Sequence, residues 1–323
     1  MRLVHAALVF CSLAVLAHGG KKSAVKQTTI SGPQPTGKHA GSPVQNDGHD
    51  YEVVVGSSGP FGPKWWTEVP TQPSGSTVGP VVGRTFTNSS VLPGARFIWV
   101  SNGSFDMGST DGTDPSRNID EVQHRVTLSG FWLLDHEVTQ GEFRNLVRHN
   151  PSRLQGDSNR PVEQVSWSEA MAFCNELTRR DREVGRIRGD QRYRLPTESE
   201  WEYAARAGEP GPRHGVLDLI AWWSGNSNGQ TNPVGGKTPN KWGFYDMIGN
   251  VSEWCFDWYG AYPASAVQDP RGPASGNFRV IRGGSWFGDG VSSVSLRLAA
   301  RTGMEPVFRK GWVGFRPALS SVR

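Results

Sequence analysis

Carboxylates in one short loop, residues 246–253, are the groups of this chain best suited to binding a metal ion. Asp246 and Glu253 stand at the ends of the loop, and Gly249 lies between them. Calcium is held by carboxylate and backbone oxygens gathered on a tight turn that contains glycine. The loop therefore predicts a calcium site. The alternative is a cation-free turn whose carboxylates cap nearby backbone amides.

A second acidic segment runs from Asp111 to Glu121. Its possible ligands are Asp111, Asp114, Asp120 and Glu121. The segment lacks the alternate-residue spacing of an EF-hand loop. We therefore expect a solvated loop here and not a second calcium site.

Residues for other chemistry are scarce. No histidine pair has a metal-binding helical spacing, and no phosphate loop, dinucleotide fingerprint or Gly-x-Ser-x-Gly motif occurs. Ser285 has no partner base in the pattern, so it is a weak nucleophile candidate and is expected to hold its turn. Arg297 and Arg301 are expected to share one face of a strand. Ligand contact is favoured for Arg297, and pairing with Asp289 or Glu305 is favoured for Arg301.

The cysteines do not form a ligand set. Cys11 falls in the expected export signal, and Cys255 follows the Glu253-Trp254 pair. Cys174 recurs with apolar residues at helical spacing, which predicts a buried, inert thiol. Without a Cys-x-x-Cys motif, a metal or disulfide framework built on cysteine is not expected.

Several motifs along the chain point to one known family. They are Asn102–Ser109, Glu137–Phe143, Tyr193–Arg206, Trp242–Trp254, Arg279–Trp286, Arg297–Arg301 and Gly311–Arg316. Together they resemble the formylglycine-generating enzyme family, the sulfatase-modifying factors built on a C-type-lectin-like fold. The resemblance covers roughly Gly94 to Ala318. It implies an α+β fold, rich in loops, with short antiparallel sheets and a few helices.

The resemblance also locates two sets of metal ligands. Oxidases of this family bind one copper ion through two cysteines after the Gly-Gly-Ser turn, and the matching positions here are Gly288 and Ser293. A soft monovalent copper ion needs soft thiolate ligands, so we expect no copper and no copper-dependent formylglycine formation. The calcium loop of the family implies the ligands Asp246, Gly249, Val251 and Glu253. Residues 222–235 look like a shortened form of the family's second calcium loop, and no site is assigned there.

Local patterns predict the elements that position these residues. Capping boxes open helices at Ser166 and Thr197, and Thr139 is a reasonable helix N-cap. Gly208 can supply a left-handed stop for the helix that Thr197 opens. Short β-prone runs are Arg96–Val100, His124–Leu128 and Phe131–Leu134, with a hairpin at Asn102–Ser109.

The N-terminal part reads as an export signal and a linker. Residues 1–20 have a charged start, an apolar middle and a small-residue exit, with cleavage after Ala17 or the nearby glycines. A lipoprotein acylated at Cys11 is less favoured, because Phe10 is bulky. Residues 21–93 form a low-complexity linker in which Trp65 and Trp66 are expected to dock on the domain or on a partner. The domain is expected at 94–319, followed by a short tail at 320–323.

A net charge of +4, spread along the chain, favours neither nucleic acid nor an anionic membrane as a partner. The irregular segment 287–310 is the expected working surface, because loops on a rigid scaffold carry specificity. Its candidate ligand contacts are Phe287, Asp289, Arg297, Phe308 and Arg309, whereas Trp286 and Trp312 are expected in the core. Aromatic and arginine anchors suit a protein or glycan partner.

Two functions follow from these patterns. The favoured one is an exported binding or scaffold component, periplasmic, attached to the cell envelope or secreted. The alternative is a non-copper oxidoreductase or protein-modifying enzyme of the same family. The distinguishing feature is the groove beside Ser285, which is either open and polar or filled by Phe287 and Phe308.

Overall fold

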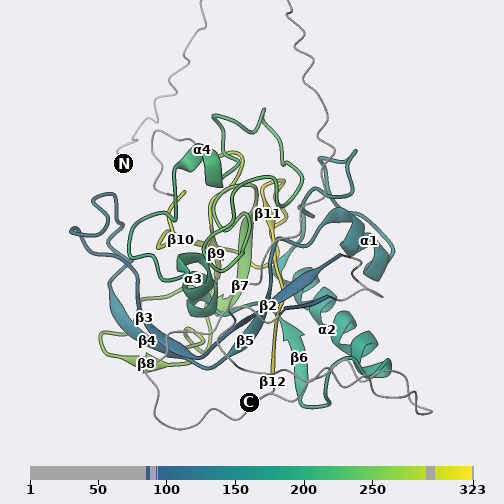
Figure 1. Cartoon of the computed structure of the whole chain (residues 1–323), viewed down its shortest axis with the longest axis horizontal. Coiled ribbons are helices and arrows are strands. Elements are labelled where there is room, and N and C mark those ends of the chain that lie inside the picture. Colours follow the sequence, from purple (N-terminus) through teal and green to yellow (C-terminus); the bar gives the residue numbers. More distant parts are fainter. Residues whose placement is uncertain (1–84, 88–91, 93, 289–294, 322–323) are drawn as a thin grey trace, which may run out of the picture. The chain divides into compact units, whose positions relative to one another are not determined.

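The described part of the chain, in a computed structural model, holds three small sheets and four helices (Figure 1). The structure describes residues 85–87, 92, 94–288 and 295–321. The expected export signal and linker, including Cys11, Trp65 and Trp66, lie outside the described residues, as do Asp289 and Ser293. None of the described helices has the length and apolar character needed to cross a membrane.

The largest sheet has the strand order β1-β2-β5-β12-β6. Its strands are β1 (Thr85–Thr87), β2 (Arg96–Val100), β5 (Phe131–Leu134), β12 (Ala318–Ser321) and β6 (Gln191–Arg194). The strands β2 and β5 confirm two predicted runs. Because β1 pairs with β2, the sheet begins before the predicted domain start at Gly94, and because β12 reaches Ser321, it also includes part of the predicted tail.

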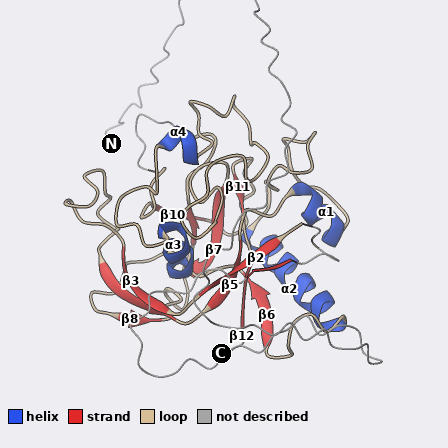
Figure 2. Ribbon diagram, in the orientation of Figure 1, coloured by secondary structure: helices blue, strands red, loops and turns tan. Residues whose placement is uncertain are grey.

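Two smaller sheets complete the described part of the fold (Figure 2). The four-stranded sheet has the order β10-β9-β7-β11, with β10 (Arg301–Met304), β9 (Arg279–Arg282), β7 (Ser252–Trp258) and β11 (Val313–Gly314). The three-stranded sheet has the order β3-β4-β8, with β3 (Gly103–Met107), β4 (His124–Leu128) and β8 (Val267–Gln268). The predicted hairpin is the β3–β4 pair. Alternate residues of β4 are buried, as a strand with one solvated face requires.

The helices begin where the sequence places their caps. They are α1 (Gln140–Val147), α2 (Trp167–Glu183), α3 (Glu198–Arg206) and α4 (Leu217–Ile220). Ser166 and Thr197 form the predicted capping boxes with the glutamate three residues later. Thr139, predicted as an N-cap, is one and also forms a capping box with Glu142. At the end of α3 the left-handed cap is Ala207 (φ 48°), and the predicted stop residue Gly208 (φ 85°) follows it.

Two apolar clusters hold these layers together. One lies around α1, α2 and the five-stranded sheet and includes the predicted core thiol of Cys174, which is fully buried. The other lies around α3 and the β3–β4 hairpin and includes Cys255. Burial raises the pKa of both thiols, so neither is a reactive nucleophile.

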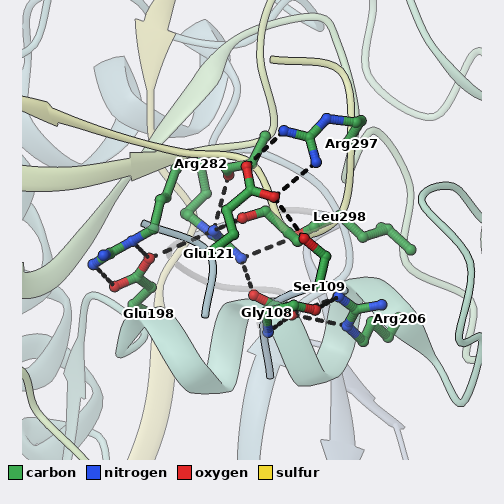
Figure 3. Close-up of polar contacts among 12 residues, drawn as sticks. Gly108, Ser109, Glu121, Glu198, Arg206, Arg282, Arg297 and Leu298 are labelled. Carbon is green, nitrogen blue, oxygen red and sulfur yellow. Dashed lines mark hydrogen bonds and ion pairs between the residues drawn. The ribbon is translucent and has the colours of Figure 1, made fainter. Parts of the chain in front are cut away.

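Helix α3 is buried along its whole length although it carries three glutamates. It contacts β3, β4, β7 and β9. Each glutamate has an arginine partner: Glu198 with Arg301 (2.7 Å at both oxygens), Glu200 with Arg194 (2.6 and 2.7 Å), and Glu202 with Arg282 and Arg206. Arg282 also donates to the carbonyls of residues 298, 299 and 300 (Figure 3). These pairs fix α3 against two sheets.

Replacement of Glu202 by glutamine should therefore destabilise the domain. The side chain is fully buried, and the change leaves Arg282 and Arg206 without their carboxylate. Breaking a buried ion pair from one side costs about 3–5 kcal/mol of unfolding free energy. Denaturant unfolding measures this loss. The control is Asp190→Asn, which removes an exposed ion pair with Arg188 and should leave the unfolding midpoint almost unchanged. Equal effects of the two variants would contradict the structural role of the buried pairs.

Candidate functional site: the groove beside Ser285

A tight glycine turn follows β9 and begins the site. Gly283 (φ 90°) and Gly284 (φ 67°) lie in the left-handed region. A Cβ on Gly284 would come within 2.8 Å of the Ser295 carbonyl oxygen, so glycine is required for space as well as for conformation. The backbone N–H of Gly288 closes the turn by donating to the Ser285 carbonyl at 2.9 Å. The Ser285 hydroxyl is nearly buried and accepts a long 3.4 Å contact from the Phe287 N–H. This agrees with the predicted role of Ser285 in holding its turn.

An open groove of about 320 Å³ lies beside this turn. Its polar lining includes Asn118, Ser252, Ser285, Ser295 and Thr302, and its apolar lining includes Ile281, Phe287, Ala300 and Trp312. A second hollow of about 350 Å³, lined by Asp120, Tyr259 and Phe278, shares Asn118, Arg301 and Thr302 with the groove, and in it the Tyr259 hydroxyl donates to Asp120. The two hollows therefore follow β10, which is an edge strand of its sheet among the described residues.

The groove is open and mixed in polarity, and it is not filled by aromatic side chains. Phe287 lines the groove, and its side chain is 67% exposed. Phe308 is 42% exposed and does not line the groove. No cysteine, histidine, aspartate, glutamate or lysine occurs among its described lining residues. Ser285 therefore has no general base in the described part of the groove.

Arg282 and Arg301 also line the groove, but both side chains are bound by carboxylates of the protein itself. Glu198 holds Arg301 through both oxygens, and Arg282 is bound to carboxylates and backbone carbonyls. A guanidinium has five N–H donors, and those bound within the protein are not free for a substrate anion. The described groove can thus bind a ligand but holds no acid–base pair.

The copper positions add no ligand in the described structure. Gly288 lines the groove without a side chain, and a Cβ there would lie 3.2 Å from the Ser285 carbonyl oxygen. Ser293 is outside the described residues. Cys174 and Cys255 are fully buried and do not line the groove. The expectation that this chain binds no copper stays a prediction.

The prediction of Arg297 as an exposed ligand contact is wrong. Its side chain is about 1% exposed, and it donates to both oxygens of Glu121, at 2.8 and 2.5 Å, and to Asp114 (Figure 3). Asp114 and Glu121 are themselves buried, so the prediction that residues 111–121 form a purely solvated loop is also wrong. The physical reason is charge compensation, because a buried guanidinium requires buried carboxylates.

The arginines also differ from expectation in their placement. Arg297 lies outside any strand, whereas Arg301 begins β10, so the two do not share a strand face. Arg301 is paired, as favoured, but its partner is Glu198 and not Glu305. Asp289, the other partner considered, lies outside the described residues. Arg309 is exposed and forms a two-point ion pair with Glu169 at 2.9 and 3.0 Å.

The two tryptophans near the groove are only half-buried, not core residues as predicted. Trp286 donates its ring N–H to the Gly311 carbonyl at 2.8 Å and meets Phe287 edge to face. Trp312 packs at the margin of the first core cluster and lines the groove. Trp312 therefore connects the groove to the core, whereas Trp286 does not line the groove.

The predicted calcium loop is buried, and its carboxylates differ in their partners. Both oxygens of Glu253 accept from Arg316 at 2.7 Å, and one also accepts from the Trp201 ring N–H. In Asp246, Oδ2 accepts from the Gly235 N–H at 2.7 Å, whereas Oδ1 is buried without a hydrogen-bond partner. Of the two side-chain ligands, only Asp246 thus offers an oxygen that is free. No group of three or more acidic, histidine or cysteine side chains suited to a metal occurs in the part of the chain that the structure describes.

Glu137 was not predicted as part of this site. It is fully buried, its Oε2 has no hydrogen-bond partner, and its Oε1 accepts a long 3.4 Å contact from the Val251 N–H. Burial, and then the charge of Asp246, raises the pKa of Glu137 well above its ordinary value. Burial likewise raises the pKa of Asp246 to about 6. The sequence showed Glu137 only as the start of a helix-entry motif, without its distant neighbours.

Comparison with known proteins gives the family. The model of the sulfatase-modifying factor enzyme 1-like domain matches residues 83–321. The chaperone protein LppX of Paenibacillus barcinonensis is 31% identical, over 65% of this chain and 83% of that protein. The formylglycine-generating enzyme of Streptomyces coelicolor is 37% identical, over 52% of this chain and 55% of the enzyme. The serine/threonine-protein kinase Pkn1 of Chlamydia pneumoniae is 32% identical, but the match spans only 38% of the kinase.

Solved structures agree on the fold. Treponema denticola variable protein 1 has a TM-score of 0.64 and 30% identity, covering 74% of this chain and 99% of that one. PvdO from Pseudomonas aeruginosa has a TM-score of 0.63 and 28% identity, covering 74% and 98%. These matches confirm the predicted α+β, C-type-lectin-like fold of short sheets with few helices. The chain belongs to the family of proteins that carry a sulfatase-modifying factor enzyme 1-like domain.

Proposed function

We propose that this chain is an exported binding domain of the cell envelope, and that it holds a protein or glycan partner in the groove along β10. The observation that carries the proposal is an open groove whose described lining has aromatic and hydroxyl groups but no acid–base pair. An exposed aromatic at the rim, Phe287, is the kind of anchor that dominates recognition. The unpaired edge of β10 offers backbone groups to an extended partner segment.

The relatives do not fix one activity for the domain. The same domain occurs in proteins named as a chaperone, a kinase and a formylglycine-generating enzyme. One fold commonly hosts several functions, so the site must carry the argument. The alternative, a non-copper oxidoreductase or protein-modifying enzyme, is favoured only by the similarity to the formylglycine-generating enzymes. It would need a catalytic group or cofactor beyond the described lining.

Replacement of Phe287 by alanine should weaken partner binding by about 1–3 kcal/mol, because the exposed ring is lost from the interface. A photo-crosslinking residue at position 287 of the full chain would first capture the partner in native envelopes, and titration would then measure affinity. The matched control is position 184, where exposed Val184 lies after α2, away from the groove. Equal capture at both positions, or an unchanged affinity of Phe287→Ala, would contradict recognition by the groove.

The protein should not convert a cysteine-containing sulfatase motif peptide to its aldehyde. The reason is that neither Gly288 nor Ser293 supplies a thiolate, which a copper(I) ion needs. Peptide mass spectrometry after incubation with the protein and copper measures the conversion. A loss of sulfur that depends on both the protein and copper would overturn the proposal and favour the enzyme alternative.

We further propose that calcium binds at the loop of Asp246 and Glu253, where it would relieve the two unpartnered oxygens of Asp246 and Glu137. Three buried carboxylates there face one guanidinium, that of Arg316, so the cluster carries excess negative charge when ionised. A divalent cation would neutralise this excess. Oxygen ligands of this type suit calcium.

Calcium should therefore raise the melting temperature, and chelator should lower it. The free energy of unfolding should rise by about 2.7 kcal/mol when calcium is at about a hundred times its Kd. Asp246→Asn should abolish the response. In chelator, the substitution should have the opposite effect on stability. The folded-state pKa of Asp246 is raised, so the stabilisation by its protonated form is full below about pH 4 and is lost as the pH rises through about 6. Above pH 6 the asparagine variant should then be the more stable protein. Coincident wild-type melting curves in calcium and in chelator would exclude the site.

A further inference from the structure

A separate cavity of about 470 Å³ lies between the three-stranded sheet, the start of α3 and the end of β7. Its walls are largely apolar and aromatic, with Met107, Trp258, Tyr262 and several prolines. Arg301 is the one described residue that also lines the groove beside Ser285. The volume falls in the range of small-molecule sites, and such sites combine apolar walls with a few placed polar groups.

Asp257 is the polar group that stands out in this cavity. It is about 3% exposed, and it forms no ion pair among the described residues. Its Oδ2 accepts from the Glu198 N–H at 2.9 Å, at the first turn of α3, and this contact fixes the carboxyl. No partner for Oδ1 occurs in the described structure. A Cβ on Gly272 would come within 3.3 Å of Oδ1, so the glycine keeps space open beside this oxygen.

The surroundings of Asp257 hold its carboxyl neutral below about pH 8, and a cation at Oδ1 would favour the ionised form. Burial, and then the charge of Glu198, raises the pKa of Asp257 to about 8. Two arginines line the cavity: Arg271 is exposed, and Arg301 is held by both oxygens of Glu198 and stacks on Tyr262. Arg301 therefore cannot serve Asp257. The charge of Arg194, which does not line the cavity, lowers the pKa of Asp257 without forming an ion pair with it among the described residues. A buried carboxylate is stable when it is paired with an opposite charge.

His124 adds a second acceptor at the cavity wall. Its Nδ1 lies 3.1 Å from the Val122 carbonyl oxygen, an acceptor, so Nδ1 carries a proton, and in the tautomer with this single proton Nε2 is an acceptor. The ring packs against Tyr262 at 4.7 Å. Two acceptors and aromatic walls match an ammonium group on an apolar body. A bare metal ion would need a third ligand, and no group of three acidic, histidine or cysteine side chains suited to a metal occurs among the described residues.

We propose that this cavity binds a small organic amine, with its ammonium group at Asp257 Oδ1 and its apolar body against Tyr262 and Met107. The site is independent of the proposed groove function. A lysine side chain of a protein would present the same ammonium group as a free amine, so the test includes both sources.

The probe is 2-phenylethylamine, compared with 2-phenylethanol and phenylacetate, titrated into the full chain by calorimetry near pH 7.5. The amine should bind at least tenfold more tightly than the uncharged alcohol, and phenylacetate should not bind. Asp257→Asn keeps an acceptor for the Glu198 N–H but loses the charge, so it should weaken amine binding at least tenfold. The control Val184→Ala, an exposed change remote from the cavity, should bind as the wild type does.

A methyl NMR signal in the wild-type chain makes the test independent of variant folding. Met107 lines the cavity, whereas Met247 is buried in the core and does not. The amine should shift the Met107 methyl resonance and leave that of Met247 in place. If an acetylated, amidated lysine tripeptide binds more tightly than 2-phenylethylamine, the natural ligand is a lysine side chain of a protein. If it binds more weakly, the natural ligand is a free amine. No shift at Met107, equal affinity for the alcohol, or full affinity in Asp257→Asn would overturn the proposal.

Discussion

The ion pairs between α3 and the arginines around it are the interaction on which the rest of this structure depends. A helix buried on all sides is ordinarily apolar, yet α3 carries Glu198, Glu200 and Glu202. Their partners come from β6, β9, β10 and α3 itself. Buried pairs of this kind add little net stability, because desolvation offsets the attraction, but an unpaired member is costly. Their consequence is geometric, since in this arrangement of the sheets each glutamate of α3 has an arginine partner.

The same pairs shape both cavities. Arg282 and Arg301 line the groove beside Ser285, and Glu198 lines the cavity at Asp257. The ion pairs therefore form a shared wall between the groove and that cavity. Because the guanidinium groups are bound from within, neither cavity presents a free arginine from this network to a ligand. Recognition in the groove then falls to Phe287, to hydroxyl groups and to the backbone edge of β10. The chemistry of each cavity therefore comes from residues outside the network.

The sequence predicted best what depends on neighbours in the chain. Each capping box needs only residues three apart, and all three predicted caps are present. The buried thiol of Cys174 followed from helical periodicity in the same way. Arg297 was misplaced because its partner Asp114 lies 183 residues away. Nothing in the local pattern distinguishes an arginine that serves a ligand from one that serves a distant carboxylate.

The groups that remain unsatisfied after all these pairings are the most informative about ligands. A buried polar atom without a partner costs about 1–3 kcal/mol, more for a charge, so a fold keeps few of them without a reason. In the described structure Asp246 and Glu137 each retain a buried oxygen without a partner, and Asp257 has a carboxyl oxygen beside an apolar cavity. The network around α3 shows that this chain does supply arginines to buried carboxylates. These three carboxyls received none of their own, and a cation from outside the chain is the partner that would complete them.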